Sequence, residues 1–115
     1  MIAAIGIDIV RISRLKPKLR DKVLCSEEKA MYDSFQSEVR KQEFLAGRFA
    51  VKEALVKAFT GIDKVCPFPD MCILNDESGK PYLAKPVLKG YRVMISLSHE
   101  KEYAAAFCIL ETDQS

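Results

Sequence analysis

Residues 43–59 read Glu43-Phe-Leu-Ala-Gly-Arg-Phe-Ala-Val-Lys-Glu-Ala-Leu-Val-Lys-Ala-Phe59, the densest helical pattern in the chain. Apolar residues at positions 44, 45, 49, 51, 55, 56 and 59 cover more than one face of a helix with about 3.6 residues per turn. Ser37 or Glu38 can open this helix, and Gly61 is a C-cap signal at its end. The pattern predicts a long core helix over residues 38–60, buried on several sides.

The first strand is predicted from an apolar, β-branched run at residues 2–10. Because side chains alternate along a strand, positions 4, 6, 8 and 10 share one face, and the isoleucines at 5, 7 and 9 share the other. Asp8 therefore has small neighbours, Ala4 and Gly6, on its own face. On the core helix, alanines at 46 and 50 line the face that carries Glu53 and Lys57, which permits close approach of a strand or a ligand.

The remaining segments predict a further helix and two strand pairs. Ser26, followed by Glu27 and Glu28, is typical of a helix N-terminus, with positions 30, 31 and 35 as its buried stripe. Residues 71–75 and 80–83 predict a hairpin, and residues 93–98 and 103–110 predict a second strand pair around a turn at 99–102. The tail at 111–115 is expected to fray.

Length and composition favour one domain spanning residues 1–115. With 49% hydrophobic residues the chain can form a modest core, and so small a domain leaves surface that oligomerisation could cover. No run reaches the roughly 18 apolar residues of a membrane span, and the N-terminus lacks the features of a signal peptide. These features favour a cytoplasmic protein that does not enter a membrane.

The cysteines at 25, 66, 72 and 108 have no Cys-x-x-Cys spacing and only one histidine to assist them, which argues against a zinc site. We expect reduced, partly buried thiols.

A basic segment lies at residues 11–22. Its six cationic residues face only one acidic residue, so the segment carries +5 and leaves −3 for the rest of the chain, whose total is +2. It could attract an acidic partner or form an ordinary solvated face. Nucleic acid is poorly supported, because no aromatic residue interleaves with the charges. The six residues are Arg11, Arg14, Lys16, Lys18, Arg20 and Lys22.

Two carboxylates occupy places where an apolar residue would be expected. Asp8 interrupts an apolar strand, and Glu53 lies within the core helix. A carboxylate removed from water without a partner costs several kcal/mol, so such residues usually bear a cation, a metal or a proton. Two hard oxygen ligands favour Mg²⁺ over zinc and leave coordination positions for water and a phosphate. The pair predicts a magnesium site for phosphate chemistry.

Lys57 and His99 are the further candidates. Lys57 follows Glu53 by one helical turn, where its ammonium could meet phosphate charge or simply pair with Glu53. His99 ends a predicted strand, where it could contact phosphate, transfer a proton or form a local hydrogen bond. The spacing alone leaves both choices open.

Three motifs resemble those of the holo-acyl-carrier-protein synthases, a family of small 4'-phosphopantetheinyl transferases. Gly6-Ile-Asp-Ile-Val10 resembles the family's N-terminal motif, and residues 43–59 resemble its signature helix. Ile95-Ser-Leu-Ser-His99 and the residues to Ala106 resemble its C-terminal motif, with Gly79-Lys-Pro81 as the hairpin before it. The resemblance spans essentially the whole chain in order.

The resemblance implies an α+β fold, with a small antiparallel sheet packed with a long core helix. It implies a homotrimer with active sites at the subunit interfaces. The implied reaction transfers the 4'-phosphopantetheine arm of coenzyme A to a serine of apo acyl carrier protein in fatty acid biosynthesis and releases adenosine 3',5'-bisphosphate.

The resemblance also assigns roles to residues of this chain. Asp8 and Glu53 would bind Mg²⁺, Lys57 would contact the pyrophosphate, and His99 would lie near the nucleotide phosphates. Arg14 and Arg48 would meet acidic groups, with Arg14 placed to dock the acidic carrier. A rival hypothesis is a non-enzymatic binding module, in which the basic segment captures an acidic partner and the two carboxylates only form ion pairs.

Overall fold

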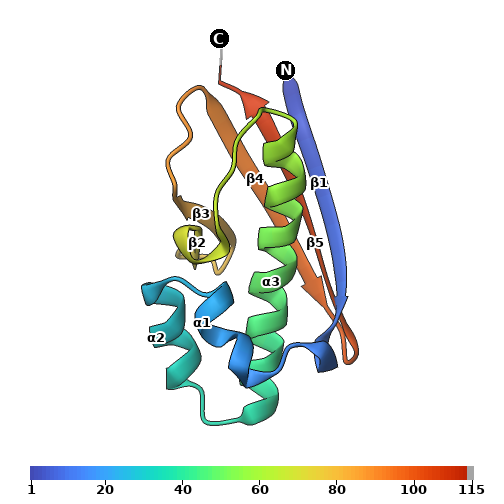
Figure 1. Ribbon diagram of the computed structural model, residues 1–115, viewed down its shortest axis with the longest axis vertical. Helices are drawn as coiled ribbons and strands as arrows, with labels where there is room; N and C mark the ends of the chain where they lie inside the picture. The colour runs from blue at the N-terminus through green and yellow to red at the C-terminus, as the bar shows by residue number, and fades with distance from the viewer. Residues whose placement is uncertain (114–115) are drawn as a thin grey trace.

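The computed structural model describes residues 1–113 and has the α+β class that the resemblance implied (Figure 1). A three-stranded antiparallel sheet has the order β1-β5-β4, and β2 and β3 form a separate two-stranded sheet. The elements are β1 (Ile2–Arg11), α1 (Arg20–Val23), α2 (Ser26–Ser34), α3 (Glu38–Thr60), β2 (Cys72–Asn75), β3 (Pro81–Lys85), β4 (Tyr91–His99) and β5 (Tyr103–Thr112), with short 3-10 helices at Ile12–Arg14, Pro17–Leu19 and Phe68–Asp70.

The long helix α3 lies along one face of the larger sheet (Figure 1), and its bounds confirm the prediction from the sequence. It is buried on several sides because the larger sheet covers one side, while α1 and α2 cover others. Helix α3 begins at Glu38, where the hydroxyl of Ser37 accepts a hydrogen bond from the backbone N–H of Arg40.

Strand β1 approaches α3 very closely at Gly6. A Cβ atom on this glycine would lie 1.8 Å from the backbone oxygen of Ala54, so only a residue without a side chain fits there. Farther along the two elements, Gly61, the C-cap of α3, meets Ala4 of β1. Residue numbers on β1 therefore rise as those on α3 fall, and the predicted alternation of β1 is confirmed: Asp8 shares the helix-facing side with Gly6.

The predicted hairpin and the predicted second strand pair are both present, as β2–β3 and β4–β5. The tail does not fray from residue 111, because β5 continues to Thr112, whose N–H donates to the carbonyl of Met1. Residues 114–115 of the expected fraying tail lie outside the described part of the chain. Within residues 1–113, no helix has the length and apolar character needed to cross a membrane.

The predicted buried stripe of α2 is partly wrong. Ala30 is exposed, whereas Glu28 and Tyr32 are buried. Glu28 turns inward because cationic side chains of α3, those of Arg48 and Lys52, lie beneath it. The helix also starts one residue earlier than predicted, with Cys25 rather than Ser26 as its N-cap.

The prediction of four reduced thiols is wrong for one pair. Cys25 and Cys72 form a disulfide with a Cα–Cα distance of 5.6 Å, which joins the start of α2 to β2 across 47 positions of sequence. Cys66 and Cys108 are free. Burial raises the pKa of the Cys108 thiol to about 11, which keeps it protonated at neutral pH.

Candidate active site

The first part of the candidate site lies at the free edge of β1. Because β1 pairs only with β5 among the described strands, its other edge offers unpaired backbone groups. Lys57 reaches this edge from α3, where its Nζ donates to the carbonyl of Ile7 at 2.8 Å and lies 3.4 Å from Oδ1 of Asp8. The structure therefore brings two of the predicted site residues together, and Lys57 pairs with Asp8 rather than with Glu53.

Glu53 lies on α3 at the level of Asp8. Gly6 of β1 contacts Ala54 and Ala58, and two residues of strand span about 6.6 Å, which corresponds to roughly four residues of helix. Moving from Gly6 to Asp8 therefore moves the contact along α3 toward Glu53, one turn before Lys57. Glu53, four residues before Lys57, shares its face of α3, while the contact between Asp8 and Lys57 is direct.

The two carboxylates fit a Mg²⁺ ion. The side chain of Asp8 is only 16% exposed, and among the described residues its ion-pair partner is the 57% exposed Lys57. Glu53 is half-buried and has neither an ion pair nor a hydrogen bond from its side chain to another residue of the described chain. A half-buried carboxylate that lacks a cationic partner is a suitable ligand for a hard cation, which uses only a few protein oxygens and keeps room for phosphate.

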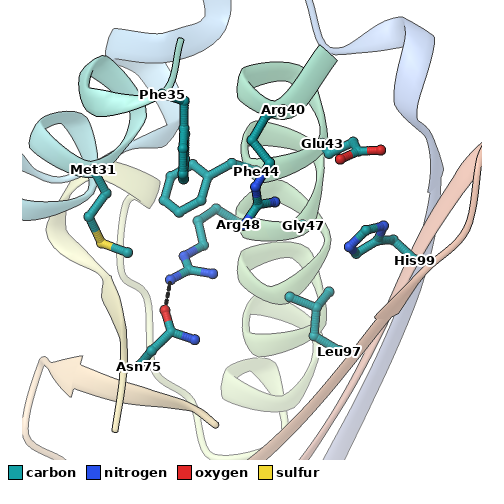
Figure 2. A pocket seen from close by; sticks show the side chains of 10 residues that line it. All are labelled: Met31, Phe35, Arg40, Glu43, Phe44, Gly47, Arg48, Asn75, Leu97 and His99. Atoms are coloured by element: carbon teal, nitrogen blue, oxygen red, sulfur yellow. Dashed lines mark hydrogen bonds between the residues drawn. The ribbon is translucent and has the colours of Figure 1, made fainter. Parts of the chain in front are cut away.

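The second part of the candidate site is a pocket between α3, β2 and the end of β4 (Figure 2). Arg48 enters it from α3, Asn75 from the last position of β2, and His99 from the last position of β4. The Nη2 atom of Arg48 donates to Oδ1 of Asn75 at 2.8 Å. The other lining residues are Met31, Phe35, Arg40, Glu43, Phe44, Gly47 and Leu97.

The charges of this pocket suit an anion. Arg40 and Arg48 both line it, while Glu43 is its only carboxylate. Arg48 is 4% exposed, and its guanidinium lies 4.5 Å from the ring centre of Phe44. Burial lowers the pKa of Arg48, Glu28 opposes this shift, and Arg40 adds to it. An anion bound beside Arg40 and Arg48 would reduce the electrostatic repulsion between these two cations, and this reduction favours its binding.

The two parts of the site lie on one helix at different heights. Arg48 and Glu53 are five residues apart, which corresponds to about 7.5 Å along the axis of α3. Around the helix axis they are also about 140° apart, so the two parts of the site face different sides of α3. This arrangement can hold a metal and a phosphate at the edge of β1 and a second anionic group near Arg48 and His99.

Fewer cationic side chains of the basic segment are available to a partner than its sequence suggested. Arg11 contacts Glu102 and Tyr103, and Arg20 pairs with Asp21 and Asp33, so both are occupied within the chain. The other four cationic residues are exposed and form no ion pair with a described residue. This cationic patch is made of Arg14, Lys16, Lys18 and Lys22.

An apolar surface lies on the opposite face of the β1–β5 pair from α3. Ile5, Ile7 and Ile9 are 58%, 63% and 65% exposed, and Phe107, which pairs with Ile7, is 38% exposed. Ile7 and Ile9 also border a pocket with Asp8 and Lys57. The apolar surface is thus continuous with the first part of the candidate site.

Some residues of the site were not found from the sequence. Asn75 was read only as a strand end, and Arg40 and Glu43 as ordinary helix residues, because nothing in their local spacing shows which elements meet in the fold. For Lys52 a signal was present: it interrupts a run of apolar helix positions, as Glu53 does. Lys52 is fully buried and contacts Glu28, whose role is developed below.

Comparison with known proteins agrees with this geometry. Residues 4–108 match the family model of the 4'-phosphopantetheinyl transferase superfamily. A holo-[acyl-carrier-protein] synthase of Staphylococcus saprophyticus is 44% identical over 118 residues, which cover 96% of this chain and 99% of the relative. The enzyme of the same name from Acholeplasma laidlawii is 43% identical over 97% of this chain and 98% of its own length.

Solved structures give the same result. The crystal structure of a holo-(acyl-carrier-protein) synthase from Bacillus anthracis, in complex with CoA (3',5'-ADP), is 36% identical to this chain with a TM-score of 0.86, and the match covers 98% of this chain and 99% of that one. The family model and these relatives together show that the chain belongs to the 4'-phosphopantetheinyl transferase superfamily and is an enzyme of its holo-[acyl-carrier-protein] synthase group.

Proposed function

We propose that this enzyme transfers the 4'-phosphopantetheine arm of coenzyme A to a serine of apo acyl carrier protein, for fatty acid biosynthesis. Transfer depends on Mg²⁺ and releases adenosine 3',5'-bisphosphate. The observation that carries the proposal is the contact of Asp8 and Lys57 at the edge of β1, where the charges suit a metal and a pyrophosphate, and the pocket of Arg48 and His99 on another side of α3 suits a separate phosphate. The names of its relatives and the ligand of the Bacillus anthracis structure support the same substrates.

In the proposed reaction the serine oxygen forms a bond to the phosphorus that carries pantetheine, and the bond from that phosphorus to the nucleotide breaks. The pyrophosphate lies at the edge of β1, beside Asp8, Glu53 and Lys57. Asp8 and Glu53 would hold Mg²⁺, which would supply neutralisation of negative charge on the pyrophosphate. The side chain of Lys57 is 57% exposed, so its ammonium can leave Asp8 and lie against the leaving phosphate, where charge increases.

The nucleotide end of coenzyme A occupies the pocket of Arg48, Asn75 and His99. Arg48 is held in place by Asn75 and by the Phe44 ring, so its donors are oriented before the ligand arrives. Such prior orientation lowers the entropy cost of binding. His99 adds a donor from the opposite element, at the end of β4.

The acidic carrier docks on the cationic patch. Arg14 ends the first 3-10 helix directly after β1, so a partner bound there lies near the strand that carries Asp8. Complementary charge accelerates encounter and orients the partner, so the patch guides the serine toward the pyrophosphate.

The active enzyme is a homotrimer, with active sites at the subunit interfaces. The apolar surface of Ile5, Ile7, Ile9 and Phe107 supports this assembly, because a contiguous apolar surface of this kind marks an interaction site. Its occupant is a second copy of the chain. Since the surface borders Asp8 and Lys57, a neighbouring subunit placed there would complete the wall of the site.

The proposal extends to a cytoplasmic location, with coenzyme A as the donor there. This location bears on the Cys25–Cys72 bond, because disulfides persist mainly in oxidising compartments. We would therefore measure whether Cys25 and Cys72 stay oxidised in a reducing buffer. This measurement tests whether the disulfide is compatible with a cytoplasmic location.

Calorimetric titration of coenzyme A, with and without Mg²⁺, tests the proposed site. We expect Mg²⁺ to tighten binding in the wild type and to have no effect in Glu53→Ala. The control is Glu77→Gln, which changes an exposed carboxylate between β2 and β3 and should behave as the wild type. Equal Mg²⁺ dependence in Glu53→Ala and the wild type would contradict the metal site, and no binding of coenzyme A to the wild type would contradict the function.

A further inference from the structure

Glu28 is a fully buried carboxylate that the proposed chemistry does not use. Its Oε1 accepts hydrogen bonds from Nζ of Lys52 at 2.6 Å and from the backbone N–H of Cys25 at 2.9 Å. Its Oε2 accepts from the backbone N–H of Ile73 at 2.9 Å and lies 3.7 Å from Nε of Arg48. One side chain of α2 thus connects the start of α2, strand β2 and helix α3.

The two cations beside Glu28 differ in how well they are satisfied. Besides Glu28, Nζ of Lys52 donates to the carbonyls of Val23 and Phe68, at 2.6 and 3.0 Å, so all three of its donors are used. By contrast, Nε of Arg48 is the one buried side-chain nitrogen or oxygen in the described chain that lacks a hydrogen-bond partner. One carboxylate faces two cations, so an uncompensated positive charge remains, and it lies on Arg48 at the pocket.

Glu28 fixes both sides of that pocket. Its charge attracts the guanidinium of Arg48 from behind, at a distance too long for a hydrogen bond. Through the N–H of Ile73 it also anchors β2 two residues before Asn75, the residue that accepts a hydrogen bond from Arg48. A displacement of Glu28 would therefore move the anion-binding donor and its orienting partner together.

We propose that Glu28 is a positioning residue for phosphate recognition, which holds Arg48 and the end of β2 in the geometry that receives the separate phosphate of the nucleotide. The inference rests on the proposed function, since it takes a nucleotide phosphate as the ligand of this pocket. The competing account is that Glu28 serves only folding, as the anion of a buried ion pair with Lys52. The two accounts predict different effects on ligand selectivity.

The decisive variant is Glu28→Gln. An amide offers one acceptor oxygen, and its NH₂ group must then face a donor, either Lys52 and Cys25 on one side or Ile73 on the other. The donor is displaced, and β2 or α2 shifts away from the pocket. Because misplacement of a recognition group by about 1 Å costs up to a hundredfold, we expect affinity for adenosine 3',5'-bisphosphate to fall at least tenfold.

The matched control is Lys52→Met. It removes the second cation beside Glu28 but leaves the carboxylate next to Arg48 and Ile73. Lys52 does not line the pocket. We expect it to lower the melting temperature while changing nucleotide affinity less than about threefold. If Glu28→Gln does not fold, Glu28→Asp takes its place, because shortening by one methylene group also withdraws the carboxylate from Ile73.

The probes are adenosine 3',5'-bisphosphate and adenosine 5'-monophosphate, titrated by calorimetry into folded protein with Mg²⁺ present. The wild type should prefer the bisphosphate, and Glu28→Gln should lose most of that preference while Lys52→Met keeps it. Unchanged preference in Glu28→Gln, or equal loss in both variants, would overturn the positioning role. A wild type that binds neither nucleotide would instead overturn the proposed function, and the inference with it.

Discussion

Replacement of Gly6 by alanine tests whether the close contact of β1 with α3 builds the site. The added Cβ would lie 1.8 Å from the backbone oxygen of Ala54, 2.8 Å from its carbonyl carbon and 3.1 Å from the nitrogen of Ala58. Contacts of a Cβ below 3.0 Å essentially do not occur. The obstacle is helix backbone rather than a flexible side chain, so the strand or the helix itself must move by about 1.2 Å, the difference between 3.0 and 1.8 Å.

This displacement should cost both stability and activity. Overpacking of a well-packed contact costs about 1–3 kcal/mol, and we expect the upper end because backbone meets backbone. Asp8 lies two residues beyond Gly6, so the same shift separates it from Lys57 and from the level of Glu53. A misplacement of about 1 Å at a reacting centre lowers the rate by up to a hundredfold, so kcat/KM should fall about 10–100-fold in the folded variant.

Chemical denaturation and steady-state transfer assays measure the two effects. The control for the stability measurement is Gly47→Ala, where the added Cβ would meet only the end of the Leu97 side chain, at 3.3 Å. A glycine-to-alanine change inside a helix also gains about 1 kcal/mol in helix propensity, so this variant should be as stable as the wild type or more so. An unfolding free energy of Gly6→Ala within about 0.5 kcal/mol of the wild type would refute the reasoning.

Three further outcomes follow from the structure. Arg14→Glu should raise the KM for acyl carrier protein severalfold and leave coenzyme A affinity unchanged; equal loss of both would contradict separate docking and donor sites. Reduction of the Cys25–Cys72 bond, which spans 47 positions, should lower the unfolding free energy by up to about 4 kcal/mol. Labelling of free thiols before and after reduction shows directly whether the disulfide is present. At pH 8 Cys66 should be alkylated before Cys108, because the Cys108 pKa of about 11 leaves roughly a thousandth of that thiol ionised. Labelling of Cys108 should become faster as the pH rises toward 11. Faster labelling of Cys108 than of Cys66 at pH 8 would contradict the burial of Cys108.

The sequence predicted the elements whose patterns are local. The bounds of α3 follow from a continuous helical pattern between Ser37 and Gly61, and the alternation of β1 correctly placed Asp8 on the helix-facing side. The resemblance assigned Asp8 and Lys57 to one pyrophosphate site but did not predict their direct contact, and the small residues on both elements explain why the two backbones can approach so closely.

The features that the sequence did not predict depend on contacts between distant segments. Cys25 and Cys72 become neighbours only when α2 packs beside β2, and no spacing rule connects them. Glu28 was predicted only as an acidic residue of a first helical turn, where such side chains are common. Its burial depends on Arg48 and Lys52, which approach from α3 more than twenty positions away.

In the proposed function the chain carries out a Mg²⁺-dependent transfer through Asp8 and Glu53. Intact-mass spectrometry of apo acyl carrier protein, incubated with the enzyme, coenzyme A and Mg²⁺, detects this transfer. We predict the addition of one phosphopantetheine arm to a single serine, lost when a chelator is added and lost in folded Glu53→Gln. A folded carrier that gains no mass, or that gains the same mass with chelator or with Glu53→Gln, would contradict the claim.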